Sequence, residues 1–474
     1  MSIFPVFAQK IAEKLPFIPN LSQQSALKML SEFILDQSGE EQIFVLRGYA
    51  GTGKTSLVGA LVRAMDEMKM RTFLMAPTGR AAKVFSSMAD KPAFTIHKSI
   101  YRQSKFNVEM QGFQLLDNRQ HNVLFICDEA SMISTLNESS SFGTGNLLDD
   151  LIEYVYSADG CRLLLVGDDA QLPPVGQMRS PALDVTQLRG YGLQVLSVQL
   201  TEVARQQLDS GILANATMLR RMLSEGQVDA LPRIMYKKFK DVRRIDGYEF
   251  LECLESSYSR QGLDDCIIIT RSNARANRFN VAVRNQILGR EEELSSGDRL
   301  LVVRNNYYWA REYDQLPFLA NGDVIEVRRV RNERSLYGFR FADVEIYLPD
   351  YDIDTEVVVL LDSLHAEGPS LPVSAQQQLF AAIAQDYPEI RSQRELYKVV
   401  RESPYFNALQ VKYAYCVTCH KSQGGQWSDV YLDVSYINPE HLGIDFYRWI
   451  YTAFTRAVQT LFLVNPSDDM LEID

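Results

Sequence analysis

The segment RGYAGTGKTS, Arg47 to Ser56, sets the tightest limit on what this chain can fold into. It carries the pattern G-x-x-x-x-G-K-T between an apolar run, QIFVL, and a stretch of helical periodicity, SLVGALVRAMDEM. A glycine-rich turn between a strand and a helix aims backbone N–H groups and the helix N-terminus at phosphate oxygens. The pattern therefore predicts a triphosphate-binding loop, in which Lys54 reaches the outer phosphates and Thr55 the magnesium ion. The loop comprises Gly48, Gly51, Thr52, Gly53, Lys54 and Thr55.

Short apolar runs recur between helical stretches, which favours an α/β fold of parallel sheets with crossover helices. They form two groups, roughly 40–170 and 265–275 with 410–466. The interval 298–404 differs, because GDRLLVVRNNYYW and NGDVIEVRRV alternate apolar and polar residues between turns. Such alternation predicts a small antiparallel β-barrel inserted into the second α/β unit.

A smaller interruption spans residues 101–121, where KFNVEM and FQLLD alternate in polarity on either side of Gln111 and Gly112. This pattern predicts a β-hairpin. Two strands this short cannot bury a core of their own, so the hairpin is expected to project from the first α/β unit. An ordinary surface hairpin without a specific role is the alternative.

Composition restricts the class of protein. The net charge of -11 argues against a broad basic surface that coats nucleic acid, although it leaves room for a narrow basic channel. No apolar run approaches the roughly 18 residues of a membrane span, and the start of the chain lacks the features of a signal peptide. A cytoplasmic protein is expected. The six cysteines are scattered, and the one C-x-x-C motif, CVTC at 416–419, has no second such motif with which to complete a zinc site. This predicts structural thiols and no structural metal.

Two further apolar strands end in polar side chains that would lie beside the phosphate loop. VLFICDEAS places Asp128 and Glu129 after a strand, where Asp128 suits magnesium and Glu129 suits deprotonation of the attacking water. Acids on an ordinary surface loop are the alternative. RLLLVGDDAQLPPVG places Gln171 after another strand, where its amide could sense a γ-phosphate.

Hydroxyl and basic side chains follow the strand in MAPTGRAAK and recur in FTIHKSI. Thr78, Thr95 and His97 could hold a nucleic-acid backbone. Thr78 and Thr95 could equally cap helices, and both roles are compatible. Farther along, Arg205 and Arg456 are candidates for the arginine that phosphate-loop enzymes commonly draw from a second body to stabilise transition-state charge.

Taken in order, these segments resemble the motifs of superfamily 1 helicases. The matching segments are GYAGTGKT, APTGRAAK, DEAS, VGDDAQLPPVG, TEVARQ, VTCHKSQGGQW and IYTAFTRA. Within that superfamily, TIH, HKSQG and NGDVIEV are most similar to the RecD-like and Dda-like branch, superfamily 1B, whose members translocate 5′ to 3′ on single-stranded DNA.

The resemblance implies two RecA-like P-loop NTPase domains, with a small β-hairpin insertion and an SH3-like β-barrel insertion. The first RecA-like domain is predicted over 1–205, with the hairpin pin at 101–121. The second is predicted over 206–297 and 405–474, and the inserted barrel over 298–404. ATP and Mg²⁺ are the implied cofactors, bound in the cleft between the RecA-like domains.

The resemblance also implies residue roles. Lys54 and Thr55 would bind phosphate and magnesium, Asp128 would be the magnesium ligand, and Glu129 the catalytic base. Gln171 would couple the γ-phosphate to DNA, and Arg205 and Arg456 would be arginine fingers. Gln23 would read adenine, with Gln24 as the alternative. Contacts to DNA would fall to Thr78, His97, Thr418 and Ser422.

Two positions depart from the family pattern. Ala204 stands where relatives often have an aromatic residue that stacks on adenine, and Gln426 stands where they often have a glutamate that meets the ribose. Another ring could replace the missing one, or base selectivity could be looser.

The preferred function is an ATP-dependent 5′ to 3′ DNA helicase, a DNA-stimulated ATP hydrolase. Its expected partners are single-stranded DNA, single/double-strand junctions and repair or recombination proteins, and it is expected to be a monomer. One alternative is a helicase of opposite polarity like the UvrD branch, although that branch usually carries a larger domain at 101–121. The other is the motor subunit of an exonuclease or recombination complex.

Overall fold

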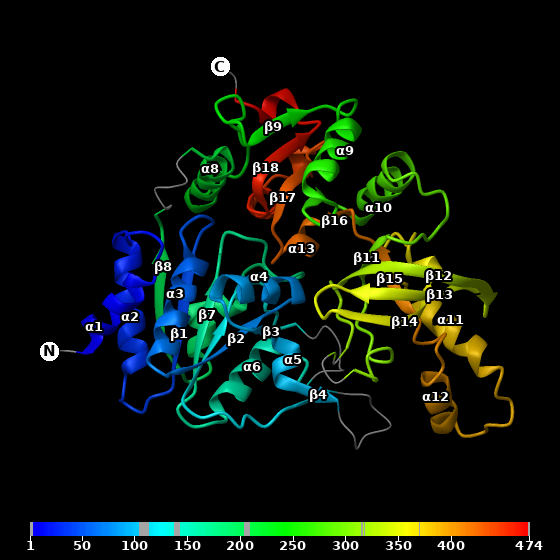
Figure 1. Ribbon diagram of the computed structural model, residues 1–474, viewed down its shortest axis with the longest axis horizontal. Helices are drawn as coiled ribbons and strands as arrows, with labels where there is room; N and C mark the ends of the chain where they lie inside the picture. The colour runs from blue at the N-terminus through cyan, green and yellow to red at the C-terminus, as the bar shows by residue number, and fades with distance from the viewer. Residues whose placement is uncertain are drawn as a thin grey trace.

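The computed structural model describes residues 3–103, 113–136, 143–202, 209–313, 316, 318–368 and 370–472. Within these residues the first α/β unit is built on a sheet of six parallel strands in the order β3-β2-β6-β7-β1-β8 (Figure 1). The strands are β1 (Gln42–Gly48), β2 (Arg71–Ala76), β3 (Ala93–Thr95), β6 (Val123–Cys127), β7 (Arg162–Gly167) and β8 (Gln194–Leu200). Four of them match the predicted apolar runs, whereas β3 and β8 were not predicted.

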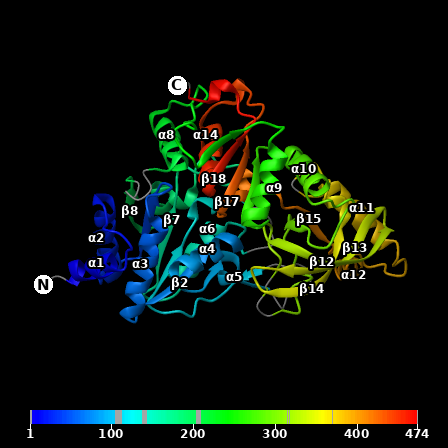
Figure 2. The ribbon, with the colours of Figure 1, turned by 45° about the horizontal axis from the view of Figure 1, so that its top comes forward.

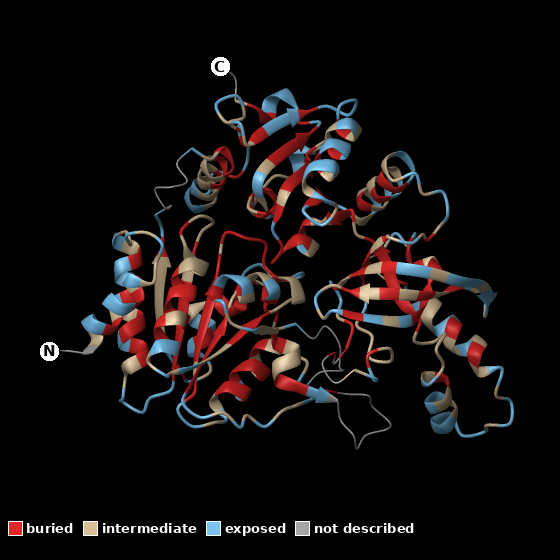
Figure 3. Cartoon of the chain, in the orientation of Figure 1, coloured by how far each residue is buried: buried red, intermediate tan, exposed pale blue. Residues whose placement is uncertain are grey.

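Both faces of this sheet are buried, which explains why its central strands are continuous apolar runs. Successive residues of β1 point to opposite faces, so Ile43 and Val45 enter one core and Phe44 and Leu46 the other. Burial of the inner strands is visible in Figure 3. The covering helices are α1 (Ile3–Glu13), α2 (Leu21–Leu35), α3 (Lys54–Glu67), α4 (Gly79–Ala89), α5 (Ile96–Ile100), α6 (Leu147–Tyr156) and α7 (Val185–Arg189).

The predicted hairpin is present in part. Strands β4 (Tyr101–Gln103) and β5 (Phe113–Leu115) pair antiparallel, with Gln103 opposite Phe113. The first strand therefore begins before the predicted KFNVEM. Phe106, Val108, Met110 and the predicted turn lie outside the described residues.

The second α/β unit contains five parallel strands among the described residues, in the order β16-β10-β17-β18-β9. They are β9 (Val242–Ile245), β10 (Cys266–Thr270), β16 (Cys416–Thr418), β17 (Trp427–Asp433) and β18 (Ala457–Val464). The helices are α8 (Gly211–Glu225), α9 (Phe250–Gln261), α10 (Asn273–Ala282), α13 (Cys419–Ser422) and α14 (Ile444–Phe454). Strands that precede the barrel in sequence (β9 and β10) and strands that follow it (β16, β17 and β18) thus form one sheet. This is the arrangement expected when a barrel is inserted into an α/β unit.

The insertion is a closed barrel of β11 (Arg299–Val302), β12 (Val324–Leu336), β13 (Phe339–Leu348), β14 (Ile353–Leu360) and β15 (Leu409–Tyr413). Two expectations need correction. The barrel is not wholly antiparallel, because β14 and β15 pair parallel, and its last strand lies beyond the predicted boundary at 404. The chain between β14 and β15 forms two helices that were not predicted, α11 (Val373–Ala384) and α12 (Gln393–Arg401). They are held against the barrel by Leu379, Ile383 and Val400, which pack with Phe341 and Leu360 in one apolar cluster.

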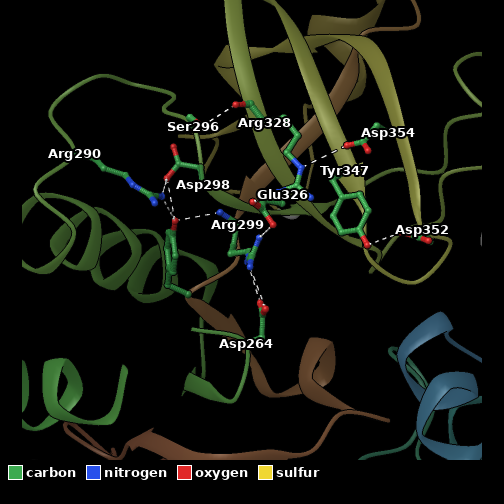
Figure 4. A network of polar contacts seen from close by, with 11 residues as sticks. Asp264, Arg290, Ser296, Asp298, Arg299, Glu326, Arg328, Tyr347, Asp352 and Asp354 are labelled. Atoms are coloured by element: carbon green, nitrogen blue, oxygen red, sulfur yellow. Dashed lines mark hydrogen bonds and ion pairs between the residues drawn. The ribbon is translucent and has the colours of Figure 1, made fainter. Parts of the chain in front are cut away.

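The barrel lies beside both α/β units in the two ribbon views (Figures 1 and 2). It is anchored to the second unit, because one continuous apolar core contains Ile268 of β10 as well as Leu300 and Ile325 of the barrel. Arg299 adds polar contacts, with its Nε 2.9 Å from Asp264 Oδ1 (Figure 4). The barrel contacts the first unit through an aromatic pair, in which the ring centroids of Phe113 of β5 and Tyr307 are 4.6 Å apart, and through an ion pair, in which Lys83 Nζ lies 3.5 Å from Asp350 Oδ1.

No helix among the described residues is long and apolar enough to cross a membrane. All six cysteines are free thiols, and Cys416 and Cys419 are both buried. Burial raises the pKa of each of these two thiols, so both stay protonated at neutral pH.

Candidate active site

The predicted phosphate loop connects β1 to α3 in a conformation that needs glycine. Gly51 and Gly53 have φ angles of +73° and +81°, in the left-handed region. A Cβ on Gly48 would lie 2.8 Å from Thr52 Oγ1 and 2.9 Å from Lys54 Cγ. Thr52 Oγ1 donates a hydrogen bond of 2.7 Å to Tyr49 O, which closes the turn. The backbone thus forms a tight cradle ahead of the N-terminus of α3, where Thr55 lies in the first turn.

Lys54 points back over this cradle. Its Nζ donates to Gly48 O at 2.6 Å and Tyr49 O at 3.0 Å, and it lies 3.9 Å from Asp168 Oδ2. Burial raises the pKa of Asp168 to about 6, while the Lys54 charge opposes that rise. Asp168 follows β7 and was not singled out from the sequence, although the strand-end argument used for Asp128 applies to it equally.

Asp128 and Glu129 follow β6 at the same edge of the sheet. Glu129 adopts a left-handed backbone with φ of +52°, and its N–H donates to Asp128 Oδ1 at 2.8 Å. A left-handed conformation is strained for a residue other than glycine, and such strain concentrates at functional sites. Burial, and then the neighbouring Glu129 charge, raise the pKa of Asp128 to about 7. A divalent cation would favour the ionised form of this crowded carboxylate pair.

Arg456 of the second unit reaches this edge. It is 3% exposed, and its Nη1 lies 4.0 Å from Glu129 Oε1. Nε donates to Thr452 O at 3.1 Å, and Nη1 donates to Gly425 O at 3.3 Å. The guanidinium is therefore held by the second unit and directed at an acid of the first.

The segment around Gln171 connects the two units. Leu172 N donates to Thr452 Oγ1 at 2.9 Å, and Gln423 Nε2 donates to Leu172 O at 2.7 Å. Gln171 is buried, and its Oε1 accepts no hydrogen bond from the described residues. A buried amide oxygen without a partner costs free energy, so a ligand or water that donates to it would be stabilising.

Tyr451 is a second residue that sequence reasoning missed. Its hydroxyl donates to Asp168 Oδ2 at 2.6 Å and accepts from Ala50 N at 3.0 Å. It thereby ties the phosphate loop and the end of β7 to α14 of the second unit. Only the motif IYTAFTRA, which also contains Arg456, could have pointed to it.

The structure distinguishes the two glutamines considered for adenine. Gln23 is buried beneath the loop, where Nε2 donates to Thr52 O at 2.9 Å and Oε1 accepts from Asn20 N at 3.0 Å. Gln24 is exposed and donates to Pro19 O. Gln23 therefore lies against the loop, and Gln24 points away from it. Gln426 is exposed beside Trp427, and Arg205 lies outside the described residues, as does Ala204.

Two family models match segments on either side of this site. Residues 23–238 match a family model described as an AAA domain, and residues 413–464 match the UvrD-like helicase C-terminal domain. The ATP-dependent RecD2 DNA helicase of Deinococcus radiodurans is 30% identical over 198 residues, covering 41% of this chain and 24% of that protein. The ATP-dependent DNA helicase dda of Enterobacteria phage T4 is 23% identical, covering 66% of this chain and 68% of its own length.

Together these matches support a superfamily 1B helicase. It is an ATP-hydrolysing helicase built on two RecA-like units with a barrel insertion. Among solved structures, a Pif1 helicase from Bacteroides in complex with ADP-AlF3 and ssDNA aligns with 97% of this chain and 95% of its own, at 16% identity and a TM-score of 0.46.

The helicase residues predicted to contact DNA lie in different settings. Thr78 caps α4 by accepting from Ala81 N at 3.2 Å, and it lies close to Gly424 of the second unit, where a Cβ would be 3.1 Å from its Oγ1. Thr418 precedes α13 without capping it through its side chain. Ser422 is fully buried and donates to Cys419 O at 2.7 Å. The structure thus brings Thr78 to the junction of the units but turns the Ser422 hydroxyl inward.

His97 lies apart from the ATP cleft. It is in α5, with its ring centroid 5.7 Å from that of Tyr101 and 6.2 Å from that of Phe318. Burial lowers the pKa of His97 to about 4, against the opposing effect of the Asp150 charge, so the imidazole is neutral near pH 7. Together with Thr78 and Thr95 it lines a cavity of about 670 Å³ that faces the barrel.

Proposed function

We propose that this helicase uses ATP hydrolysis to translocate 5′ to 3′ on single-stranded DNA and to separate the strands of a duplex ahead of it. The observation that carries this proposal is the approach of Arg456, held by the second RecA-like unit, to Glu129 of the first. A cleft with a phosphate loop on one side and an arginine on the other can link nucleotide turnover to movement of the two units.

The residues of the cleft divide the chemistry. Lys54 and the loop N–H groups bind the outer phosphates, and Gln23 supports the loop from below. Thr55 and Asp128 would hold Mg²⁺, which when bound neutralises charge on the phosphate oxygens. Glu129 accepts a proton from the attacking water as the oxygen bonds to the terminal phosphorus and ADP leaves. Arg456 stabilises the charge that develops on the transferred group, with Arg205 proposed as a second arginine finger.

Coupling to DNA follows from the connections across the cleft. Gln171 follows β7 at the carboxyl edge of the first sheet, where the phosphate loop lies. The next residue, Leu172, hydrogen-bonds through its backbone to Thr452 and Gln423 of the second unit. A change at the γ-phosphate can therefore shift the second unit relative to Thr78, the proposed DNA contact of the first. If the distance between the DNA contacts of the two RecA-like units changes in each ATP cycle, the strand is moved along them step by step.

A strand-displacement assay tests the direction of movement. Duplexes with a 5′ tail, a 3′ tail or no tail are incubated with the intact chain and ATP, and release of the labelled strand is followed. We expect release only from the 5′-tailed duplex, and none with Lys54→Ala, because that variant loses the phosphate contacts of its amine. Release from the 3′-tailed duplex alone would instead assign the polarity of the UvrD branch.

We further propose that the hairpin of β4 and β5 acts as the strand-separating pin, braced by the barrel. Its support is the aromatic cluster of Phe113, Tyr307 and Phe318, in which the Phe113 and Phe318 centroids are 5.9 Å apart. Replacing residues 105–112 with a short Gly-Ser linker should leave DNA-stimulated ATP hydrolysis intact and abolish unwinding of the 5′-tailed duplex. This change keeps Phe113, so the brace survives.

The control is Tyr248→Ser, in the exposed segment at 247–248 of the second unit. It should affect neither activity. Unwinding at the parent rate after the 105–112 replacement would show that another element separates the strands.

A further inference from the structure

Arg80 lies in the first turn of α4 and reaches across to the second unit. Its guanidinium carbon is 3.9 Å from the ring centroid of Trp427, the buried first residue of β17. Its Nη2 also donates to Gln426 O at 3.1 Å. A guanidinium over an indole face is attracted by the ring quadrupole, and the backbone hydrogen bond fixes its orientation. Arg80 therefore ties the N-terminal end of α4 to the start of β17.

Two glycines allow this close approach. Gly424 has a φ of +72°, and a Cβ there would lie 2.9 Å from Ala81 Cβ of α4. A Cβ on Gly425 would lie 3.0 Å from Arg80 Nε and would overlap the Trp427 ring. Neither position has room for a side chain, so this segment packs directly on the first turn of α4.

The same segment holds the arginine proposed to stabilise the transition state. Gly425 O accepts from Arg456 Nη1 at 3.3 Å, and Trp427 N donates to Arg456 O at 3.0 Å. Arg456 Nη1 in turn lies 4.0 Å from Glu129 Oε1. Arg80 is thus two contacts away from Glu129, the first to this segment and the second from the segment to Arg456.

The first turn of α4 also carries a proposed DNA contact. Thr78 caps the helix by accepting from Ala81 N at 3.2 Å, so Thr78 and Arg80 belong to one hydrogen-bonded turn. A displacement of Thr78 therefore moves Arg80 with it. The contacts form a continuous connection from the proposed strand-binding end of α4 to the Arg456 guanidinium.

We propose that Arg80 is a positioning residue for ATP hydrolysis, which holds Arg456 toward Glu129 and makes that placement depend on the strand bound at α4. The inference rests on the proposed roles of Arg456 and Thr78 and extends them, because it names the side chain that connects the two. A strand bound at Thr78 fixes the first turn of α4 and, through Arg80, the segment that holds Arg456. Without the contact to Trp427, Arg456 keeps its chemistry but loses part of its orientation.

Arg80→Met tests this role, because methionine keeps an unbranched apolar side chain but removes the cation. At saturating oligothymidylate, kcat for ATP hydrolysis should fall about tenfold or more with KM for ATP near that of the parent, since misplacing a catalytic group by about 1 Å can cost about 10²-fold. Without DNA, turnover should change less, so the stimulation by DNA falls. Phosphate release measures both rates. Arg80→Lys should retain more of the turnover, because its cation can still lie over the Trp427 ring.

A double-mutant cycle with Arg456→Lys shows whether Arg80 acts through Arg456. Arg456→Lys is expected to hydrolyse ATP slowly, so a further loss can be measured. Adding Arg80→Met should lower kcat by less than about twofold, because the guanidinium that Arg80 positions is already absent. The same large loss in both backgrounds would show that Arg80 acts independently and would overturn the inference. The Arg80→Lys cycle gives the same readout if Arg80→Met does not fold.

The matched control is Arg243→Met, on β9 at the edge of the second sheet. Arg243 is exposed and also lies over an aromatic ring, with its guanidinium carbon 5.3 Å from the Phe462 centroid. This variant should keep the parent kcat and the parent stimulation by DNA. A loss equal to that of Arg80→Met would reduce the effect to general charge and would overturn the inference.

The remaining outcomes separate this inference from the proposed function. Parent-like kcat in Arg80→Met, together with slow turnover in Arg456→Lys, would overturn the positioning role and leave the role of Arg456 in place. Parent-like turnover in Arg456→Lys would overturn the role of Arg456 and the inference with it. A loss in Arg80→Met that is regained at higher oligothymidylate concentration would make Arg80 a direct DNA contact and would also overturn the inference.

Discussion

Glu129→Gln should reduce the rate of DNA-stimulated ATP hydrolysis by about 10²–10⁴-fold while leaving nucleotide affinity close to that of the parent. Glutamine has nearly the shape of glutamate, so the fit against Asp128 and Arg456 is retained. Its amide cannot accept the proton of the attacking water, which is the step assigned to Glu129. Phosphate release with saturating single-stranded DNA measures turnover, and titration of a fluorescent nucleotide measures affinity.

The matched control for this variant is Glu153→Gln, an exposed acid on α6 of the same unit. It should hydrolyse ATP at the parent rate. Turnover near normal in Glu129→Gln would show that another group takes the proton, and the closest alternative acid at the phosphate loop is Asp168, 3.9 Å from Lys54.

The sequence was sufficient to predict the two parallel sheets because their inner strands must be apolar on both faces. The apolar runs VLFIC and RLLLVG coincide with β6 and β7 at both ends. The polar residues after these strands could be located for the same reason, since parallel strands share one carboxyl edge. Local pattern thus predicted where Asp128, Glu129 and Gln171 would lie.

Features that depend on distant contacts were missed or misassigned. Tyr451 bonds to Asp168 across the cleft, and nothing near either residue signals that pairing. Residues 405–474 were predicted to belong to the second RecA-like domain, but β15 (Leu409–Tyr413) pairs with β11 and β14 and so belongs to the barrel. Four of the nine residues of α12 are charged, and its place against the barrel depends on Val400 and its neighbours.

The residues predicted to contact DNA show that a sequence motif does not determine the direction in which each side chain points. Thr78 and Thr95 cap helices, as the alternative interpretation proposed, and Thr78 also reaches the junction with Gly424. Ser422 lies in α13, and its hydroxyl donates inward to Cys419 O. A motif indicates which segment lies at a site, whereas the direction of each side chain depends on the packing around it.

Arg456→Ala should lower turnover by about 10³-fold or more, with a much smaller change in nucleotide affinity, because the charge that an arginine finger meets develops in the transition state. The guanidinium is held 4.0 Å from Glu129 Oε1 by its hydrogen bonds to Thr452 O and Gly425 O. These contacts also stabilise the second unit, so if Arg456 has only a structural role, Arg456→Ala should lower the unfolding temperature as well.

Arg456→Lys separates the two roles, since it keeps a charge but lacks the planar fork that pairs with a phosphoryl group. We expect Arg456→Lys to unfold near the parent temperature and still hydrolyse ATP slowly, measured by phosphate release with saturating single-stranded DNA. Parent-like turnover in both variants would make Arg456 a structural residue of the cleft wall and would assign the transition-state contact to another cation.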